Sequence, residues 1–205
     1  MKILYFYDPL CGWCFAFAGA VKQLKEKYPD WDFEIISGGM VRGVNEGPIG
    51  NMSSYILSAL PRVEEMSGVK FGAAYREVLK DGTQNTSSVP PSKALAIVKK
   101  HFPEQQYSYA EAMQQAYYIE GQDLTSIETH KKLFADLGLP VELLENEFDS
   151  EEAMKLALED FQFSANCGIT GYPALVIQKG EEYFLAAKGY TSFEQLANVV
   201  DRIIE

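Results

Sequence analysis

Two cysteines near the N-terminus, separated by two residues, constrain this chain most strongly. Residues Lys2–Tyr7 form a run typical of a buried strand, Asp8-Pro9-Leu10 is typical of a turn, and a helix is expected to open at Cys11. Two thiols at this spacing at the start of a helix form the minimal unit for thiol–disulfide exchange. The segment Cys11-Gly12-Trp13-Cys14 therefore predicts redox chemistry at this end of the chain.

The helix after this motif is predicted from the spacing of its apolar residues. Four of them recur on one helical face before Pro29: Phe17, Val21, Leu24 and Tyr28. Cys11 then lies at a helix N-terminus, where free N–H groups and the helix dipole stabilise a thiolate, the dipole by roughly 0.3 to 2 kcal/mol. Gly12 and Trp13 place no ionisable group beside this sulfur. We therefore expect a moderately oxidising couple, in a thioredoxin-type arrangement of strand, turn, CxxC and helix.

A zinc site and a structural disulfide are the alternative uses of the cysteine pair. Zinc would need more ligands at a metal-binding spacing, and the chain offers only Cys167, His101 and His130. A disulfide that closes a two-residue loop constrains the unfolded chain only weakly. We therefore expect redox-active cysteines, no metal and no cofactor.

Composition narrows the class of protein and its partners. The chain has 205 residues, 47% of them hydrophobic, which is enough for a substantial core. Its net charge of −11 argues against nucleic acid or an anionic membrane as a partner. No segment approaches the roughly 20 apolar residues of a membrane span. Because the first strand is predicted to begin at Lys2, we expect no secretory signal. Three cysteines, an odd number, suit a reducing compartment. We expect a cytoplasmic protein.

The character of the chain changes twice along its length. Trp31–Ser37 predicts a second strand that ends at Gly38-Gly39. From about residue 45 to 164 helical periods replace strand signals, with a capping-box candidate at Thr125-Ser126-Ile127-Glu128. Helix starts are expected near Asn51, Ser92, Glu104, Thr125 and Asp149. In the last of these helices, one apolar face is predicted from Met154, Leu158, Phe161 and Ala165.

Strands return at Ala174–Gln178 and Glu181–Ala187, and Ser192 is expected to begin a final amphipathic helix. The strands and helices predicted at the two ends of the chain would together form one unit, with the helical segment inserted between them. The sequence thus predicts an α/β thioredoxin-like fold with a large all-helical insertion. Its domains would be a discontinuous thioredoxin-like unit, 1–44 with 165–205, and an inserted helical domain, 45–164.

The segment Gly168-Ile169-Thr170-Gly171-Tyr172-Pro173 comes directly before the returning strand. A proline at a strand entry is sterically ordinary. In a thioredoxin-like fold, however, Pro173 is expected to be cis and to face the CxxC sulfurs, with the backbone before it free to pair with an extended substrate. Tyr172 would then lie beside the reactive sulfur. We expect Trp13, Tyr172 and Pro173 to contact substrate.

Four segments together resemble the DsbA-like thioredoxin family, and more closely its soluble branch without signal peptides, which includes FrnE-like proteins. The similar segments are Tyr7–Cys14, Ser88–Ala94, Gln114–Leu124 and Gly168–Leu175. The resemblance covers nearly the whole chain. It implies that Cys11 attacks and forms the mixed disulfide, that Cys14 resolves it, and that Pro173 is the cis proline. It also implies thiol or disulfide partners, either proteins or small molecules, with glutathione among the candidates.

Two differences from members of this family limit which of their activities can be expected of this chain. The periplasmic DsbA oxidants have a histidine between the cysteines, whereas Gly12-Trp13 has none, so their strong oxidising power is not expected. The kappa-type glutathione transferases and chromene-carboxylate isomerases have serine at the position of Cys11. Because this chain has cysteine at both motif positions, Cys11 and Cys14, the glutathione-dependent chemistry of those relatives is the second hypothesis here.

Several other residues have ordinary structural interpretations. Cys167 is expected to pack as a small apolar residue, with a third redox thiol as the alternative. Asp8 is expected to form a turn, with proton transfer to Cys14 as the alternative. His101 is expected at a helix end and His130 on a solvated helix. The aromatic cluster of Tyr107, Tyr109, Tyr117 and Tyr118 is expected in the core of the helical segment. The alternative is that one or two of these rings line a groove above the CxxC.

Three functions follow from these features. The leading hypothesis is a thiol–disulfide oxidoreductase working through Cys11 and Cys14, which in a reducing cytoplasm would favour a reductase, isomerase or stress-response role. The second is a glutathione-dependent transferase or isomerase of the kappa-like type, which should survive loss of Cys14. The third is a peptide-binding module that uses the cysteine pair only as a redox switch.

Overall fold

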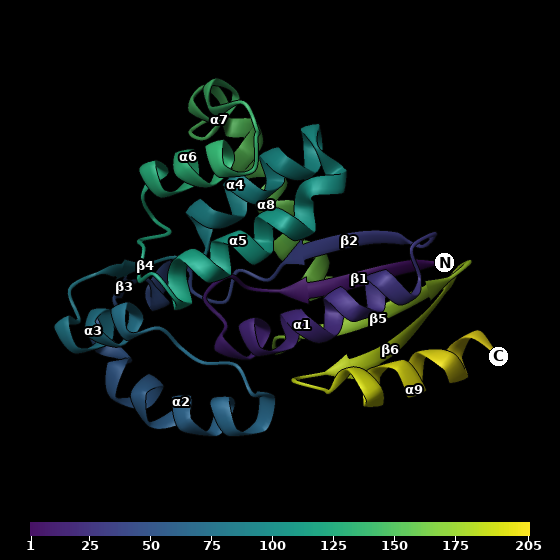
Figure 1. Cartoon of the computed structure of the whole chain (residues 1–205). Helices are drawn as coiled ribbons and strands as arrows, with labels where there is room; N and C mark the ends of the chain where they lie inside the picture. Colours follow the sequence, from purple (N-terminus) through teal and green to yellow (C-terminus); the bar gives the residue numbers. More distant parts are fainter.

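A four-stranded mixed sheet forms the centre of the molecule. In the computed structural model, which describes all residues from Met1 to Glu205, the strands are β1 (Lys2–Tyr7), β2 (Asp32–Ser37), β5 (Ala174–Lys179) and β6 (Glu182–Lys188). Their order is β2-β1-β5-β6, with β1 parallel to β2 and the other pairs antiparallel (Figure 1). The two ends of the chain thus build one sheet, as predicted.

Helices fill most of the chain between β2 and β5. The nine α-helices are α1 (Gly12–Lys27), α2 (Ser53–Ser67), α3 (Ala73–Asp81), α4 (Val89–His101), α5 (Gln106–Tyr118), α6 (Ile127–Asp136), α7 (Val141–Glu147), α8 (Glu151–Asn166) and α9 (Phe193–Ile204). Three 3-10 turns and a short strand pair complete the list: η1 (Gly43–Asn45), η2 (Ile49–Asn51), η3 (Pro103–Gln105), β3 (Gly47–Pro48) and β4 (Asn85–Thr86). In Figure 1, α2 and α3 lie near the N-terminal end of α1, and α6 and α7 lie farther from the sheet.

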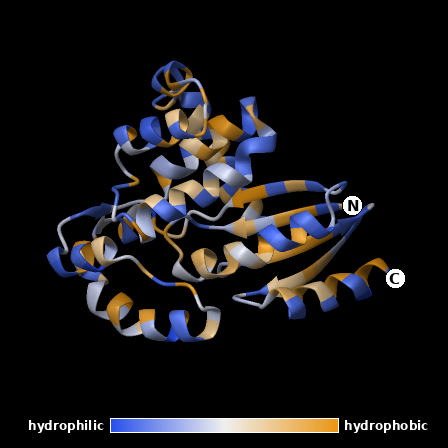
Figure 2. Ribbon diagram, in the orientation of Figure 1, coloured by the Kyte–Doolittle hydropathy of each residue, from blue (hydrophilic) through white to orange (hydrophobic).

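Side chains alternate between the two faces of β1. Ile3, Tyr5 and Tyr7 belong to the large apolar cluster that includes residues of α1 and α9. Leu4 and Phe6 face the other side, where the Phe6 ring stacks 6.0 Å from Phe163 of α8. Figure 2 shows the hydrophobic residues concentrated along these strands. Both faces of β1 are therefore covered.

The large cluster joins 42 buried residues from the sheet and from the helical segment. It includes Leu24 of α1, Leu175 of β5 and Tyr109 of α5. The four tyrosines of the predicted aromatic cluster are buried as expected, namely Tyr107, Tyr109, Tyr117 and Tyr118. One continuous core therefore crosses the boundary near residue 45. The division into a discontinuous unit and an inserted domain stays a prediction.

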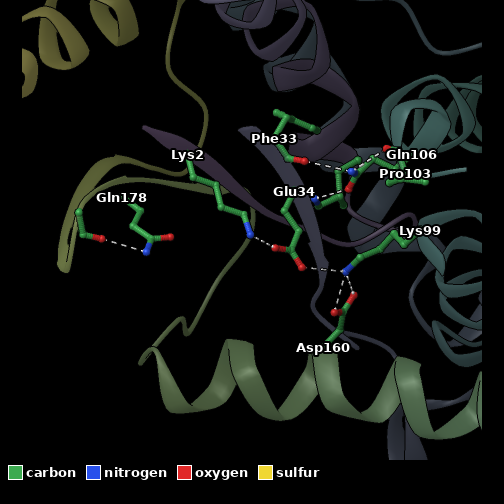
Figure 3. Close-up of polar contacts among 10 residues, drawn as sticks. Lys2, Phe33, Glu34, Lys99, Pro103, Gln106, Asp160 and Gln178 are labelled. Atoms are coloured by element: carbon green, nitrogen blue, oxygen red, sulfur yellow. Dashed lines mark hydrogen bonds and ion pairs between the residues drawn. The ribbon is translucent and has the colours of Figure 1, made fainter. Parts of the chain in front are cut away.

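Side chains from the helical segment occupy the outer edge of β2. Gln106 accepts from the N–H of Ile35 at 2.8 Å and donates to the carbonyl of Phe33 at 3.0 Å (Figure 3). Asp160 of α8 accepts from the N–H of Ser37 at 3.0 Å and pairs with Lys99 of α4 at 2.8 Å. Unpaired edge groups would otherwise invite another strand. The helical segment thus closes this edge of the sheet.

The predicted elements match the structure with specific corrections. All four strands of the sheet and the helices after Cys11 and Ser192 are confirmed, and Ser192 caps α9 by accepting from the N–H of Gln195. The helices α3 and α7 and the short β3–β4 pair were not predicted. The capping-box prediction at Thr125 is wrong by one residue, because Ser126 is the N-cap and accepts from Glu128.

The predicted apolar face of α8 is also wrong in part. The buried stripe is Ala153, Ala157, Phe161 and Ser164. Met154 and Leu158 are exposed, at 37% and 46%, and Ala165 is exposed as well. The helix packs against α4 and β2.

Candidate active site

Cys11 is the N-cap of α1 and lies almost buried, at 5% exposure. Its φ of −92° and ψ of 109° are extended, so the chain turns from the loop into the helix at this residue. The N–H of Cys14 donates to the Cys11 sulfur at 3.3 Å. The sulfur is therefore held at the electropositive end of α1, where a thiolate is stabilised.

Cys14 lies one helical turn further on and is fully buried. Burial raises the pKa of the Cys14 thiol well above its usual range, and the neighbouring Cys11 sulfur adds to this rise. Both cysteines are free thiols in this structure. The pair is thus asymmetric, because Cys11 lies at the helix end and Cys14 is enclosed and stays protonated.

The peptide bond between Tyr172 and Pro173 is cis, as predicted. The loop returns to the cysteines from far along the chain, and the Cys11 thiol donates to the carbonyl oxygen of Tyr172 at 3.4 Å. Pro173 is buried directly before β5, and its carbonyl accepts from the N–H of Gly189 at 2.7 Å. The structure therefore brings Cys11, Cys14 and the Tyr172–Pro173 bond together.

Tyr172 lies beside the Cys11 sulfur through its backbone carbonyl, and its ring is held by other contacts. Its hydroxyl donates to the carbonyl of Gly38 at 2.9 Å and contacts the Ser164 hydroxyl at 3.0 Å. A Cβ placed on Gly38 would lie 2.1 Å from the ring. The ring is thus held in a slot between the end of β2 and α8, and it fixes the loop rather than lining a free surface.

Trp13 is half-buried on the first turn of α1, and its ring lies 6.0 Å from Tyr190. On the other side of the motif, Phe71 from the helical segment lies 3.7 Å from where a Cβ on Gly12 would be. Phe15 packs 5.5 Å from the same Phe71 ring. Aromatic side chains from both parts of the chain therefore surround the start of α1.

Asp8 forms the predicted turn by accepting from the N–H of Leu10 at 3.0 Å. The same carboxylate accepts from the N–H of Met40 at 2.7 Å and from the hydroxyl of Ser88 at 2.9 Å. Burial raises the pKa of this carboxyl, although the three hydrogen bonds act to lower it. Asp8 therefore connects the active-site turn to two segments that lie far from it in sequence.

Two other residues differ from what the sequence predicts, and a third agrees with it. Cys167 is exposed at the end of α8 and does not pack in the core. His130 is fully buried rather than solvated, and its ring contacts the Tyr109 hydroxyl at 2.8 Å and the Leu124 carbonyl at 2.9 Å. His101 lies at the end of α4, as predicted.

Gly38, Ser88 and Ser164 support the site and were not singled out from the sequence. In the sequence, Gly38 stands out only as a strand end and Ser88 only as part of a family-like segment.

No three His, Cys, Asp or Glu side chains gather closely enough to hold a metal ion. None of the helices has the length and apolar character needed to cross a membrane.

The family model described as the DSBA-like thioredoxin domain matches residues 2–201. The chain belongs to this family. The thioredoxin-like fold with a helical insertion is thereby established, and this fold is consistent with a disulfide oxidoreductase. A search of curated proteins finds no match.

Several solved structures share this DsbA-like fold over nearly the whole chain. A candidate protein disulfide isomerase from Nitrosomonas europaea is 26% identical, with a TM-score of 0.86 and coverage of 99% of this chain and 97% of that one. The cytosolic disulfide reductase DsbM from Pseudomonas aeruginosa is 20% identical, with a TM-score of 0.84 and coverage of 100% and 99%. A 2-hydroxychromene-2-carboxylate isomerase is 15% identical, with a TM-score of 0.70 and coverage of 100% and 96%. At 20% and 15% identity, the last two show the fold alone.

Proposed function

We propose that this DsbA-like protein catalyses dithiol–disulfide exchange with Cys11 as the nucleophile and Cys14 as the resolving thiol. The observation that carries the proposal is the asymmetry of the pair. Cys11 lies at the helix N-terminus with its sulfur accepting from the N–H of Cys14, whereas Cys14 is buried with a raised pKa. One thiol is placed to attack a substrate, and the other is placed to attack Cys11 afterwards.

The exchange proceeds in two balanced steps. The Cys11 thiolate attacks a substrate disulfide, so that a Cys11–substrate bond forms and the departing substrate sulfur takes a proton from solvent. The Cys14 thiol then loses its proton and attacks the Cys11 sulfur, which releases the second substrate thiol. The substrate gains two electrons, and the protein becomes a Cys11–Cys14 disulfide that a dithiol or thiol reductant must reduce again.

The residues around the sulfurs fit a substrate that binds across them. The carbonyl of Tyr172 already accepts a hydrogen bond beside Cys11, and an extended substrate would approach this cis-proline loop with its backbone. Pro173 and the Trp13 ring would form the flanking surface. We propose these three residues as the substrate contacts, with Tyr172 acting through its backbone because its ring is held by Gly38.

We propose a reducing role in the cytoplasm, where a dithiol form would predominate. The DsbM structure, named a cytosolic disulfide reductase, is compatible with this role. A DsbM structure with GSH and the isomerase structure keep glutathione-dependent chemistry as the second candidate. That chemistry would need only Cys11 and should survive removal of Cys14.

The test combines a redox titration with three cysteine variants. In glutathione buffers, alkylation and mass spectrometry should reveal a reversible two-electron couple between about −270 and −120 mV, the range of known catalysts. Insulin reduction should be lost in Cys11→Ser and Cys14→Ala, and Cys14→Ala should accumulate a mixed disulfide on Cys11. The exposed Cys167 gives the matched control, and Cys167→Ser should remain active. Full activity in Cys14→Ala would reject dithiol exchange and favour the glutathione-dependent alternative.

A further inference from the structure

The face of the sheet that points away from α1 and α9 is covered over only part of its width. On this face α8 packs against β2, and Phe163 of α8 stacks on Phe6 of β1. Tyr183 and Leu185 leave the β6 side of the same face open, at 58% and 53% exposure. Exposed apolar side chains that lie together are typical of a binding surface, because burying them against a ligand is favourable.

A cavity of about 380 Å³ lies on this open part of the sheet, and we call it the sheet cavity. Its lining includes the buried side chains of Leu4 and Val176, which form an apolar floor. Tyr183 and Leu185 of β6 line it on one side, and the loop 167–171 lines it on another. The volume is in the range of small-molecule sites, about 300–1,000 Å³.

The sheet cavity is separate from the active-site cysteines. Leu4 and Val176 belong to the small apolar cluster on the α8 side of the sheet, whereas Cys11 and Cys14 belong to the large cluster on the α1 side. The loop 167–171 ends directly before the Tyr172–Pro173 bond, but its side of the cavity faces away from the start of α1. A ligand in the sheet cavity would therefore not touch the reacting sulfurs.

A bulge in β6 directs Lys188 to the sheet cavity. Val176 lies opposite Leu185, and Ala174 lies opposite Lys188, so this stretch of β6 has one residue more than that of β5. Opposite side chains in a sheet share a face, and Ala174 belongs with Val176 to the cluster on the cavity side. Without the extra residue, Lys188 would point to the α9 side. The bulge thus brings a positive charge to an apolar cavity.

Lys188 is the one charged side chain of the cavity lining, and it forms no ion pair within the chain. The lining has no aspartate or glutamate, although the chain has 29 of these residues. Because no carboxylate of the protein neutralises Lys188, its ammonium is free to pair with an anion.

The loop beside Lys188 adds two hydrogen-bond donors. Thr170 and Gly171 line the cavity, and their N–H groups have no acceptor within the chain. The N–H of Gly189 donates to the carbonyl of Pro173 at 2.7 Å, which holds the backbone after Lys188 next to the end of this loop. An ammonium and free N–H groups are donors that suit a carboxylate. The cavity therefore combines an apolar floor with a cationic rim.

We propose that the sheet cavity binds a small monocarboxylate with an apolar body. The body lies on the floor formed by Leu4 and Val176, and the carboxylate pairs with Lys188 and the N–H groups of the loop. An amine would be repelled by Lys188, and a second carboxylate would lie unpaired on the apolar floor, at a large desolvation cost. This site goes beyond the proposed exchange reaction and does not depend on it.

The exposed Cys167 lines the sheet cavity and gives a built-in reporter of its occupancy. The probe is octanoate, and the readout is the rate at which iodoacetamide, an uncharged reagent, alkylates Cys167 in the reduced protein, followed by peptide mass spectrometry. Alkylation should slow to a plateau as octanoate is added, because a bound ligand covers the thiol. Alkylation of Cys11 in the same sample is the internal reference and should keep its rate.

Octylamine tests the role of charge, because it has the same apolar chain with the opposite charge. It should protect Cys167 about tenfold less tightly than octanoate, since attraction to Lys188 is replaced by repulsion. Lys188→Gln should raise the octanoate midpoint about three- to fivefold, as expected for an exposed ion pair. The matched control is Lys22→Gln, because Lys22 is exposed on α1, pairs with no carboxylate and lies outside the cavity. It should keep the midpoint of the unmodified protein.

Two leucines test the apolar part of the site. Leu185 lines the sheet cavity, whereas Leu158 of α8 does not, although both are about half exposed. Leu185→Ala should raise the octanoate midpoint about fivefold through lost apolar contact, and Leu158→Ala should leave it unchanged.

Any of four results would overturn the proposal. Octanoate leaves the alkylation rate of Cys167 unchanged, or it protects Cys11 as strongly as Cys167. Octylamine protects as tightly as octanoate, or Lys188→Gln and Lys22→Gln have the same midpoint. Each of these results is independent of disulfide exchange, so a failure of the site leaves the proposed reaction of Cys11 and Cys14 standing, and the reverse also holds.

Discussion

The Tyr172 ring occupies the space that a side chain on Gly38 would need. Its hydroxyl donates to the Gly38 carbonyl, and a Cβ on Gly38 would lie 2.1 Å from the ring. The carbonyl of the same tyrosine contacts the Cys11 thiol. The absence of a side chain at the end of β2 therefore determines where the cis-proline loop lies against the nucleophile.

Gly38→Ala should destabilise the protein and slow disulfide exchange. The added methyl group would displace the Tyr172 ring from its slot, and overpacking of this kind costs about 1–3 kcal/mol. The displaced loop would move the Tyr172 carbonyl away from Cys11. Urea unfolding and single-turnover exchange measure the two effects.

Gly19→Ala is the matched control for this variant. Gly19 is an exposed residue inside α1, and a Cβ there would meet nothing within 4 Å. Because alanine favours a helix over glycine, this change should raise the free energy of unfolding by about 0.5–1 kcal/mol. A Gly38→Ala variant as stable and as active as the unmodified protein would contradict the role of the slot.

Ser88→Ala should cost about 1–3 kcal/mol of stability. The change leaves the buried Asp8 carboxylate without the Ser88 donor and the N–H of Val41 without its acceptor. Ser87→Ala is the control, since the Ser87 hydroxyl bonds the exposed Glu46 and the N–H of Val89. Denaturant unfolding should show a smaller loss for Ser87→Ala, and equal losses would argue against the Asp8–Ser88 connection.

The sequence predicts those helices and strands whose apolar pattern lies within one short segment of the chain. The strand before Cys11, the apolar face of α1 and the two strands after Pro173 each lie within a short window, and each prediction was confirmed. The helices α3 and α7 were missed because they are short. α3 has only two buried residues, Tyr75 and Leu79, too few for a clear helical period.

The supporting contacts of the site could not be predicted from such windows. Asp8 and Ser88 are 80 residues apart, and Gly38 and Tyr172 are 134 apart. Nothing in the sequence near either partner identifies the other. His130 was wrongly placed in solvent for a related reason, because the charged residues beside it point away while its own ring faces the core.

Gln106→Ala should lower the free energy of unfolding, because this side chain holds the outer edge of β2. The change leaves the N–H of Ile35 and the carbonyl of Phe33 without their side-chain partner, at about 1–3 kcal/mol for each unpaired buried group. An exposed strand edge also promotes association between chains. We expect a lower midpoint in urea and larger species in size-exclusion chromatography.

Gln105→Ala is the neighbouring control for the edge variant. Gln105 precedes α5 and makes no side-chain capping bond. Its replacement should leave both the unfolding midpoint and the elution volume close to those of the unmodified protein. If Gln106→Ala behaved in the same way, the edge of β2 would not depend on this side chain.

His130 should make the protein less stable in acid. Because the Leu124 carbonyl can only accept, Nε2 of the ring carries the proton, and Nδ1 accepts from the Tyr109 hydroxyl. Burial lowers the pKa of His130 from 6.5 to about 4. Between these values the unfolded chain binds a proton that the folded chain does not, so stability falls as the pH falls.

The stability lost through His130 between pH 7 and pH 4.5 should be about 2–3 kcal/mol. Asp8 and Asp160 act in the opposite direction, because burial raises the pKa of both carboxyls, so their folded forms bind protons first as the pH falls. The measurement is therefore a difference between variants. His130→Gln should be less stable at pH 7 but should lose about 2–3 kcal/mol less on acidification, whereas His101→Gln, at the exposed histidine, should keep most of the loss. Equal acid losses in His130→Gln and the unmodified protein would show that this buried ring does not control the acid response.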